Sequence, residues 1–315
     1  MRFTLKQLRY FDAAMRTGSI ARAATEMNIS QSSITASIDA IEQTVGTELF
    51  RRIPAKGVQP TDAGQTVGTR IALFLEQARV FESDLMSLTG DPTGTLHLGC
   101  YAPTAPYVLP RLLKHLSQIY PSIRIDLKEE TLDTLKELLQ SGRIDLALTY
   151  HLQGPEDGPF QPLFMARPWA LVPLNSPLAA RTCVTLADLS GLPMILLDLP
   201  SAQNYFRRVF TNHGLDMKIA HTTKSSSVLR GLVAAGFGYG ILNICSKADR
   251  DPTNGYVARP IAGEVDTPQF GVAFTHASRR SALVRAVLDI SADLAETGAF
   301  NDLTLWPEGE DSPKI

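Results

Sequence analysis

The stretch GSIARAATEMNISQSSITASIDAIEQTVGTELF, residues 18–50, decides how the N-terminal part of the chain folds. Ser19 is a good helix N-cap, and the apolar residues of the segment 20–27 recur at helical spacing. A break at Asn28-Ile29 follows, and Ser30 then caps a second helix with one apolar stripe. That stripe contains Ile34, Ile38, Ile41 and Val45. Two short helices joined by such a break are typical of a helix-turn-helix.

The outer face of the second helix carries short side chains without charge. They are Ser32, Ser33, Thr35, Ala36 and Ser37. Such a surface can approach base edges in the major groove of DNA without a large desolvation cost. Two short amphipathic helices are also common pieces of helical bundles, so this stretch alone leaves DNA binding open.

The flanking segments favour the DNA-binding interpretation. An apolar helix precedes the pair, with Leu5, Leu8, Phe11, Ala14 and Met15 on one face. Residues 51–58, RRIPAKGV, carry three cations and no acid, and their Pro and Gly indicate a turn between two short strands. A basic hairpin beside a helix-turn-helix is a wing, placed to touch phosphates.

With these features the chain resembles the LysR-type transcriptional regulators. The matching motif runs through Ser30-Gln31, Ile34-Thr35, Ile38, Ile41-Glu42, Val45-Gly46, Leu49-Phe50, Arg52, Thr61 and Ala63-Gly64, with Leu5, Leu8, Phe11, Ser19 and Ala23-Ala24 upstream. The resemblance covers nearly the full length, because the order of the later elements also fits. It implies a bacterial DNA-binding protein that responds to a small molecule and acts as a tetramer assembled from dimers.

The recognition helix departs from the family pattern at three positions. Many members have Pro where this chain has Ser32, Arg where it has Ala36, and a neutral or basic residue where it has Asp39. The helix is therefore poor in cations, and more of the affinity for DNA has to come from the wing and the helix N-termini. The candidates for base contacts are Gln31, Ser33, Thr35 and Ser37. The candidates for phosphate contacts are Ser19, Arg22, Arg51, Arg52 and Lys56.

Length and charge agree with a DNA-reading head on a larger body. The 315 residues are enough for two or three domains, and the formal net charge is −2. Residues 1–61 hold eight Lys/Arg and five Asp/Glu, a net charge of +3, which leaves −5 for the remainder. The sequence has neither a run of about 18 apolar residues nor an N-terminal apolar signal, so we expect a cytoplasmic protein without a membrane span.

The three cysteines, Cys100, Cys183 and Cys245, are far apart and lack metal-ligand or CxxC spacing. Small core residues are the favoured interpretation, ahead of a redox-sensing disulfide. We expect no metal and no cofactor.

Residues 62–89 are expected to form a long linker helix. Apolar residues recur there at alternating steps of four and three, which defines a heptad seam. The seam contains Val67, Ile71, Phe74, Ala78, Phe81, Leu85 and Leu88. It favours a dimer-forming helix over a single amphipathic helix that lies on its own domain. A dimer would present two recognition helices to two half-sites on one face of the duplex.

Beyond a turn-rich hinge near residues 89–94, strand-like and helical patterns alternate, which argues for parallel sheets flanked by helices. Expected strands cover 95–100, 123–127, 146–150, 169–173, 194–198, 218–223, 239–243 and 270–274, and expected helices cover 105–119, 132–141, 201–212, 225–235 and 281–296. The fold class is therefore α/β. The domains are a winged helix-turn-helix (1–61), a linker helix (62–89), an effector-binding domain (90–306) and a flexible tail (307–315). The resemblance implies that the effector-binding domain consists of two subdomains, about 95–165 plus 269–300 and 166–268, as in periplasmic binding proteins.

In open α/β sheets, ligands bind beyond the carboxyl ends of the strands. The candidate effector-binding residues there are Tyr101, Pro103, Thr104, Thr131, Thr149, Tyr150, Asp198, Pro200, Ser201, Thr223, Ser225 and Ser226. Thr104, Ser201 and Ser225 would open helices, so their hydroxyls and the free N–H groups favour a small anion, most often a carboxylate. Taken singly, each Ser or Thr also fits an ordinary N-cap, and each Tyr fits simple packing.

Competing chemistry finds little support in the chain. GxSxG and Walker motifs are missing, the six histidines lack ligand spacing, and Gly236-Phe237-Gly238-Tyr239-Gly240 precedes a strand and so fits a helix-to-strand turn. We predict a sequence-specific transcriptional regulator, and no enzyme, with DNA, a small anionic effector and a second copy as partners. RNA polymerase is kept as a further candidate partner. Two alternatives remain: a small-molecule binding protein whose head only oligomerises, and, less favoured, an enzyme on the two-subdomain body.

Overall fold

The computed structural model describes residues 3–53, 57–86, 92–151 and 158–310. The chain divides into an N-terminal unit, residues 1–88, and a C-terminal unit that contains nearly all of the rest. In the described part of the chain, no helix is long and apolar enough to cross a membrane.

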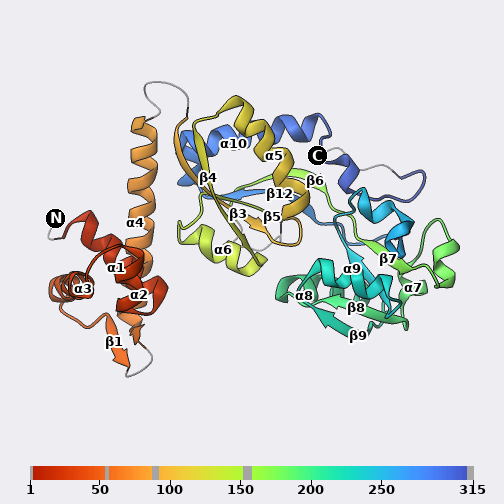
Figure 1. Cartoon of the computed structure of the whole chain (residues 1–315), viewed down its shortest axis with the longest axis horizontal. Helices are drawn as coiled ribbons and strands as arrows, with labels where there is room; N and C mark the ends of the chain where they lie inside the picture. The colour runs from red at the N-terminus through yellow and green to blue at the C-terminus, as the bar shows by residue number, and fades with distance from the viewer. Residues whose placement is uncertain (1–2, 54–56, 87–91, 152–157, 311–315) are drawn as a thin grey trace. The chain divides into compact units, whose positions relative to one another are not determined.

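The N-terminal unit is a winged helix-turn-helix followed by a long helix (Figure 1). Its elements are α1 (Leu5–Thr17), α2 (Ile20–Glu26), α3 (Gln31–Val45), the antiparallel strands β1 (Phe50–Ile53) and β2 (Gly57–Pro60), and α4 (Asp62–Met86). The predicted apolar stripes meet in one core that holds Leu8, Phe11, Ile34, Ile38, Ile41 and Leu49. Each such side chain contributes about 1.5–3 kcal/mol on burial, so the stripes hold the three helices together.

Local chemistry places each break in this unit. Gly18 ends α1 in the left-handed region at φ 61°, and Asn28 takes φ 53° between α2 and α3. Asparagine tolerates this region better than other residues with a side chain, because its short amide can hydrogen-bond to the backbone nearby. At Gly64 an added Cβ would lie 1.9 Å from the carbonyl oxygen of Leu49, so only glycine allows α4 to pack against the wing here.

One carboxylate ties the recognition helix to the wing. Glu42 lies in α3, and its Oε1 accepts hydrogen bonds from the backbone N–H of Leu49 at 2.6 Å and of Phe50 at 3.0 Å. These two amides lie immediately before and at the start of β1, so Glu42 fixes the orientation of the wing relative to the recognition helix.

The C-terminal unit contains two five-stranded sheets. The first has the order β4-β3-β5-β12-β6 and consists of β3 (Gly94–Tyr101), β4 (Ile123–Glu130), β5 (Leu146–Tyr150), β6 (Phe160–Met165) and β12 (Gln269–Phe274). β3 is parallel to β4 and β5, whereas β12 runs antiparallel to β5 and β6. Helices α5 (Ala105–Ile119) and α10 (Ala282–Glu296) pack together on one face, and α6 (Leu132–Gln140) lies on the other (Figure 1).

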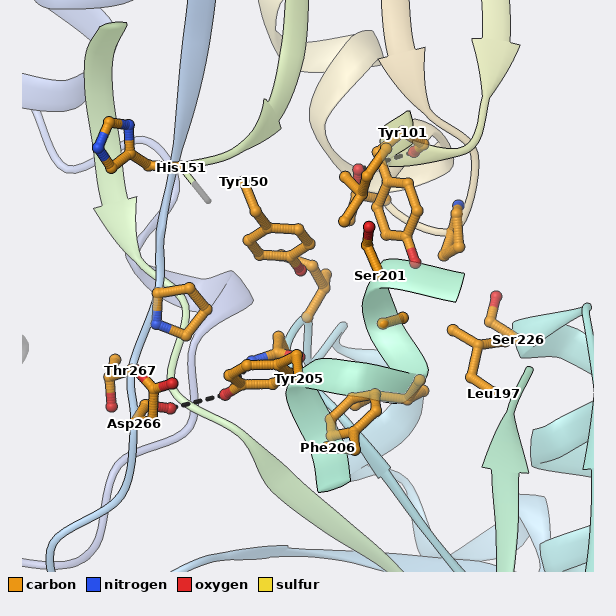
Figure 2. A pocket seen from close by; sticks show the side chains of 18 of the residues that line it. Tyr101, Tyr150, His151, Leu197, Ser201, Tyr205, Phe206, Ser226, Asp266 and Thr267 are labelled. Atoms are coloured by element: carbon orange, nitrogen blue, oxygen red, sulfur yellow. Dashed lines mark hydrogen bonds between the residues drawn. The ribbon is translucent and has the colours of Figure 1, made fainter. Parts of the chain in front are cut away.

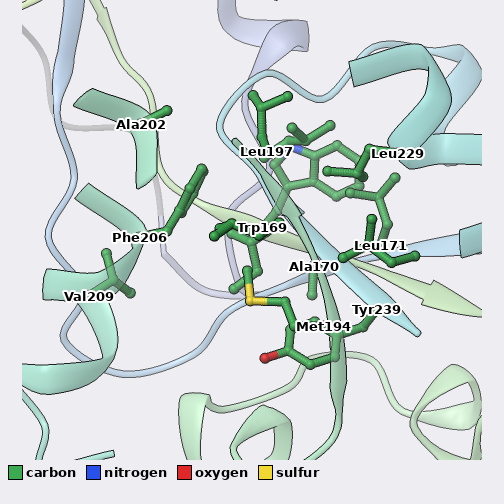
Figure 3. Packing of buried hydrophobic residues seen from close by; sticks show 14 of the residues in the cluster. Trp169, Ala170, Leu171, Met194, Leu197, Ala202, Phe206, Val209, Leu229 and Tyr239 are labelled. Atoms are coloured by element: carbon green, nitrogen blue, oxygen red, sulfur yellow. The ribbon is translucent and has the colours of Figure 1, made fainter. Parts of the chain in front are cut away.

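The second sheet has the order β11-β7-β10-β8-β9. It consists of β7 (Trp169–Pro173), β8 (Pro193–Leu197), β9 (Lys218–Thr223), β10 (Tyr239–Leu242) and β11 (Tyr256–Pro260). The helices are α7 (Leu186–Leu189), α8 (Pro200–Thr211) and α9 (Ser226–Ala234), with short 3-10 turns at Pro177–Ala180, Ala248–Arg250, Pro252–Asn254, Ser278–Arg280 and Asn301–Leu303. Trp169 is fully buried in its core beside Met194 and Leu229 (Figure 3).

The chain passes between the two sheets twice, at residues 166–168 and 261–268. This double crossover confirms the predicted α/β class with two subdomains. Two observed strands, β6 and β11, were not among the predicted ones.

The predicted flexible tail needs a correction. Pro307 is buried, and the Glu310 carboxylate lies 3.2 Å from the guanidinium of Arg167 in the first crossover. Arg167 also lies over the ring of Trp306, with 5.2 Å between the guanidinium carbon and the ring centroid. Residues 307–310 are therefore held against the body by charge and by a cation–π contact, and residues 311–315 lie outside the described part.

Candidate functional site

The first turn of α3 presents the polar surface that the sequence indicates. Ser30 caps the helix, and its Oγ accepts from the N–H of Ser33 at 3.3 Å while lying 2.8 Å from Ser32 Oγ. Gln31 is exposed, and Ser33 and Thr35 are half-buried. This turn therefore carries several small donors and acceptors together with the free N–H groups of a helix start.

Ser37 is a correction to the predicted base-contacting set. Its side chain is only 5% exposed, and its Oγ donates to the carbonyl of Ser33 at 2.9 Å. The position lies three residues after Ile34 and four before Ile41, so helical spacing places it on the core face. Ser32 and Ala36 are exposed instead and share the outer face with Gln31 and Thr35.

The predicted phosphate contacts lie on the wing and on α2. Arg51 and Arg52 are exposed on β1, opposite Gln59 and Val58 of β2. Ser19 caps α2 by accepting from the N–H of Arg22 at 3.4 Å, and the exposed Arg22 guanidinium donates to the Thr17 carbonyl. Lys56 lies outside the described residues.

A cavity of about 110 Å³ lies between the two sheets of the C-terminal unit (Figure 2). Six of the predicted effector-binding residues line it: Tyr101, Pro103, Thr104, Tyr150, Ser201 and Ser226. The other lining residues were not among the effector-binding candidates, and they are Leu132, His151, Leu197, Ala202, Tyr205, Phe206, Arg208, Arg230, Leu242, Asn243, Ile244, Asp266, Thr267 and Pro268. Many of these come from the body of α8 and from the crossover segments.

Six predicted residues do not line the cavity, namely Thr131, Thr149, Asp198, Pro200, Thr223 and Ser225. Local hydrogen bonds explain three of them. Thr131 Oγ1 accepts a hydrogen bond from the backbone N–H of Thr134 at 3.3 Å, and Ser225 Oγ accepts one from the N–H of Val228 at 3.3 Å. Thr223 Oγ1 accepts a hydrogen bond from the N–H of Ser225 at 3.2 Å. These side chains act as ordinary helix and turn caps.

Two hydroxyls that do line the cavity already donate to the protein. Thr104 Oγ1 donates to the carbonyl of Tyr101 at 2.9 Å. Ser201 Oγ donates to Oδ1 of Asp133 at 2.7 Å, which links α8 of the second subdomain to α6 of the first. The prediction that the hydroxyls of Thr104, Ser201 and Ser225 converge and are free to bind a ligand is therefore wrong. Hydrogen bonds to a ligand have to come from other donors.

Tyrosines supply those donors. Burial raises the pKa of the Tyr101, Tyr150 and Tyr205 phenols, so all three remain protonated near neutral pH. Among the described residues, the hydroxyls of Tyr101 and Tyr150 have no hydrogen-bond partner, which leaves both free to donate to a ligand. Figure 2 shows these two rings coming from the first subdomain, opposite Ser201 and Tyr205 on α8.

The charged groups at the cavity differ in how far they are neutralised. Arg230 makes a bidentate pair with buried Asp249, with Nε–Oδ1 at 2.6 Å and Nη2–Oδ2 at 3.0 Å. Burial alone would raise the pKa of Asp249, but the hydrogen bonds from Arg230 hold that pKa below its ordinary value. Within the described part of the chain, Arg208 has no carboxylate partner and is exposed, as is Asp266.

Tyr205 connects the cavity to both crossovers. Its hydroxyl donates to the backbone carbonyl of Asp266 at 2.6 Å (Figure 2) and accepts from Nδ2 of Asn243 at 3.2 Å. The same Nδ2 donates to the carbonyl of Ala166 at 2.8 Å. A displacement of the Tyr205 ring would therefore alter hydrogen bonds that reach Ala166 in one crossover and Asp266 in the other.

Two of the three cysteines, Cys100 and Cys245, are poor nucleophiles in this setting. Burial raises the pKa of the Cys100 and Cys245 thiols to about 12, so both remain protonated near neutral pH. The described residues contain no group of three or more His, Cys, Asp or Glu side chains placed to hold a metal ion.

Two family models match the chain. A bacterial regulatory helix-turn-helix model, lysR family, matches residues 5–65. A LysR substrate binding domain model matches residues 89–296. The two matches correspond to the winged head and to the two-sheet body.

Individual proteins agree with these matches. The HTH-type transcriptional regulator YvbU of Bacillus subtilis is 26% identical over 262 residues, which cover 83% of this chain and 89% of YvbU. Two solved structures from Pseudomonas aeruginosa are also similar. A LysR family regulator described as PA01 protein is 30% identical with a TM-score of 0.58, and covers 92% of this chain and 98% of its own. HinK, a LysR family transcriptional regulator, is 29% identical with a TM-score of 0.59, and the match covers 93% of this chain and 98% of HinK.

Proposed function

The chain belongs to the LysR family of bacterial transcriptional regulators, and we propose that it reads a specific DNA site under the control of a small anionic effector. It is a transcriptional regulator with a helix-turn-helix and an effector-binding domain, and its relatives are regulators rather than enzymes. The sequence specificity and the chemistry of the effector are the parts that we propose here.

Sequence-specific reading is supported by the exposed first turns of α3. Gln31 and Thr35 can form hydrogen bonds with base edges, and neither side chain carries a charge that would bind all sequences equally. The exposed Arg51 and Arg52 supply affinity for phosphates, which depends little on sequence. Specificity and bulk affinity thus come from different elements.

A dimer formed through α4 is supported by its unpartnered apolar seam. Phe74, Phe81 and Leu85 of the predicted heptad are 40%, 62% and 48% exposed, whereas Ile71 is buried against its own unit. We propose a second copy of this chain as the occupant, because a heptad seam pairs with another such seam. The seven-residue pattern extends to Leu88, which lies outside the described residues. RNA polymerase is kept as a further proposed partner.

An anionic effector is supported by the helix starts at the cavity. Thr104, Ser201 and Ser226 lie at the starts of α5, α8 and α9, and all three line the cavity. The positive ends of the helix dipoles and the free phenol donors of Tyr101 and Tyr150 favour negative charge on a ligand. The convergence of three helix starts on one cavity is the observation that carries the effector proposal.

The proposal is tested by binding of the purified full-length protein to the DNA directly upstream of its own gene. Fluorescence anisotropy across a salt series, with scrambled DNA of equal length as competitor, separates site recognition from phosphate binding. We expect a preference for the upstream DNA and an affinity that falls steeply with salt. Arg52→Ala should reduce the slope of log affinity against log salt by about one.

Two results would contradict the proposal in different ways. Equal affinity for scrambled DNA would refute sequence-specific reading of that region. Failure of a folded oligomer to bind either DNA at low salt would favour a small-molecule binding protein whose head only oligomerises.

A further inference from the structure

Aromatic rings line opposite walls of the effector cavity. Tyr101 and Tyr150 from the first subdomain meet edge to face, with centroids 5.7 Å apart and planes at 71°. Tyr205 and Phe206 on α8 lie opposite them, with centroids 5.0 Å apart (Figure 2). Leu132, Leu197 and Leu242 add aliphatic surface to the lining, which also contains polar and charged residues. Such a surface binds a flat apolar group through ring contacts, which favour offset or edge-to-face arrangements.

The size of the cavity limits what that flat group can be. Its volume of about 110 Å³ is smaller than the cavity of about 150 Å³ that is known to hold benzene in a protein interior. The cavity is open on one side, so a substituent can extend toward solvent while a ring fills the enclosed part. The enclosed part therefore holds one six-membered ring at most, and a fused pair of rings exceeds it.

The polar groups locate the charged end of the ligand. The Ser201 hydroxyl already donates to Asp133, and a second carboxylate in that corner would be repelled. At the α9 end the Ser226 hydroxyl has no hydrogen-bond partner among the described residues, and Arg230 donates from Nη1 to the Ser226 carbonyl at 3.3 Å. The Ser226 hydroxyl and the start of α9 therefore offer free donors, while the charge of Arg230 is already paired with Asp249.

The hydroxyl of Tyr101 adds an independent sign of a ligand. The residue is only 3% exposed, yet its hydroxyl has no partner within the described part of the chain and points into the cavity (Figure 2). Because this hydroxyl opens into the cavity, it is free to donate to an acceptor that a ligand supplies.

We propose that the effector is a small acid with a single aromatic ring, which lies between Tyr101, Tyr150 and Phe206 with its carboxylate directed to Ser226. This proposal rests on the anionic effector proposed above and adds the ring, the size limit and the orientation. The ring is recognised by aromatic contacts, and the carboxylate by the Ser226 hydroxyl and the start of α9.

Four probes of matched shape test the proposal by calorimetric titration of the full-length protein. Benzoate has the ring and the charge, cyclohexanecarboxylate lacks the aromatic face, benzamide lacks the charge, and 2-naphthoate adds a second ring. We expect benzoate to bind, and each of the other three to bind at least tenfold more weakly. Equal binding of cyclohexanecarboxylate would overturn ring recognition, and equal binding of 2-naphthoate would overturn the size limit.

Point variants test the orientation. Ser226→Ala should weaken benzoate binding about tenfold, because one hydrogen bond to the carboxylate is lost. Ser227→Ala is the matched control, since Ser227 is the exposed neighbour on α9 that does not line the cavity, and it should change the affinity less than twofold. Equal effects of the two variants would contradict the assigned carboxylate position.

The outcomes also separate this inference from the proposed function. If benzoate fails to bind at 10 mM while a short aliphatic acid such as succinate binds, the aromatic inference is wrong and the anionic effector stands. If benzamide binds as tightly as benzoate, the anionic part of the proposed function is wrong. If neither acid binds, both proposals are wrong.

Discussion

Replacement of Glu42 by alanine should uncouple the wing from the recognition helix. The carboxylate accepts two backbone hydrogen bonds, from Leu49 at 2.6 Å and from Phe50 at 3.0 Å. A hydrogen bond to a charged group contributes about 1.5–3 kcal/mol, and Glu42 is half-buried, so we take the lower limit for each. Loss of both should therefore destabilise the segment by about 3 kcal/mol, or on the order of a hundredfold in its opening equilibrium.

Hydrogen exchange read by mass spectrometry measures this in the full-length protein, because a peptide that covers residues 47–53 contains both amides. Glu42→Ala should increase exchange in that peptide by on the order of a hundredfold. Glu42→Gln, which keeps an uncharged acceptor oxygen, should increase it roughly tenfold. DNA affinity should fall in the same order, since Arg51 and Arg52 are placed by this segment.

Glu48→Ala is the matched control. Its side chain is exposed and makes no hydrogen bond or ion pair among the described residues, so exchange should stay within twofold of the wild type. If Glu42→Ala and Glu48→Ala give the same exchange rates, the two hydrogen bonds do not hold the wing and the reasoning is refuted.

Three further predictions concern reading, assembly and signalling. Thr35→Ala should lower the preference for the specific site over scrambled DNA about tenfold, while Ser37→Ala, a change on the core face, should leave it within twofold in competition anisotropy. Phe81→Asp should convert the oligomer to smaller species in sedimentation velocity, because it puts a charge into the apolar seam of α4, whereas Gln77→Asp outside that seam should not. Tyr205→Phe keeps the ring but removes its hydrogen bonds to the crossovers, so benzoate should bind within about threefold of the wild-type affinity while its effect on DNA binding is lost. A Tyr205→Phe protein that still responds to bound benzoate would show that the signal does not pass through this hydroxyl.

The fold of the winged helix-turn-helix was predictable because the sequence patterns that specify it are local. The apolar stripe of α3, the caps at Ser19 and Ser30, and the basic hairpin each lie within a few residues of one another. The prediction that Ser37 contacts bases was wrong because it relied on the polar character of serine and not on the helical spacing of position 37. Position 37 falls between Ile34 and Ile41 on the stripe, and the period of 3.6 residues places it in the core.

The two strands that the sequence did not indicate share a physical cause. β6 contains Pro162 and β11 ends with Pro260, and proline lacks the backbone N–H that other residues donate to a neighbouring strand. Both strands lie at the edges of their sheets, where a proline is tolerated. An interior proline correctly argues against a central strand, but it leaves an edge strand open.

The cavity was predictable only where it follows the strand ends. Tyr101 and Tyr150 are the last residues of β3 and β5, and Ser201 lies at the start of the helix that follows β8, so the rule for open α/β sheets identifies them. Tyr205 and Arg208 lie four and seven residues after Ser201 on the same face of α8, and they reach the cavity only because that face turns toward the first subdomain. Their position depends on how two separately folded sheets meet, which no pattern in the sequence specifies.

The dual position of Tyr205 has a consequence for control. A ligand shifts the equilibrium between two conformations only as far as it binds one of them better than the other. The cavity lies between two subdomains joined by two crossovers, so a side chain that both lines the cavity and bonds the crossovers can couple ligand binding to their relative position. Tyr205 has this link, because its ring lines the cavity while its hydroxyl bonds to Asp266 and to Asn243. Tyr101 and Tyr150 belong to one subdomain. A ligand that contacts only these two residues would bind without shifting the equilibrium between conformations. Contact with α8 is therefore the requirement that an effector has to meet, and a ring that spans both walls meets it.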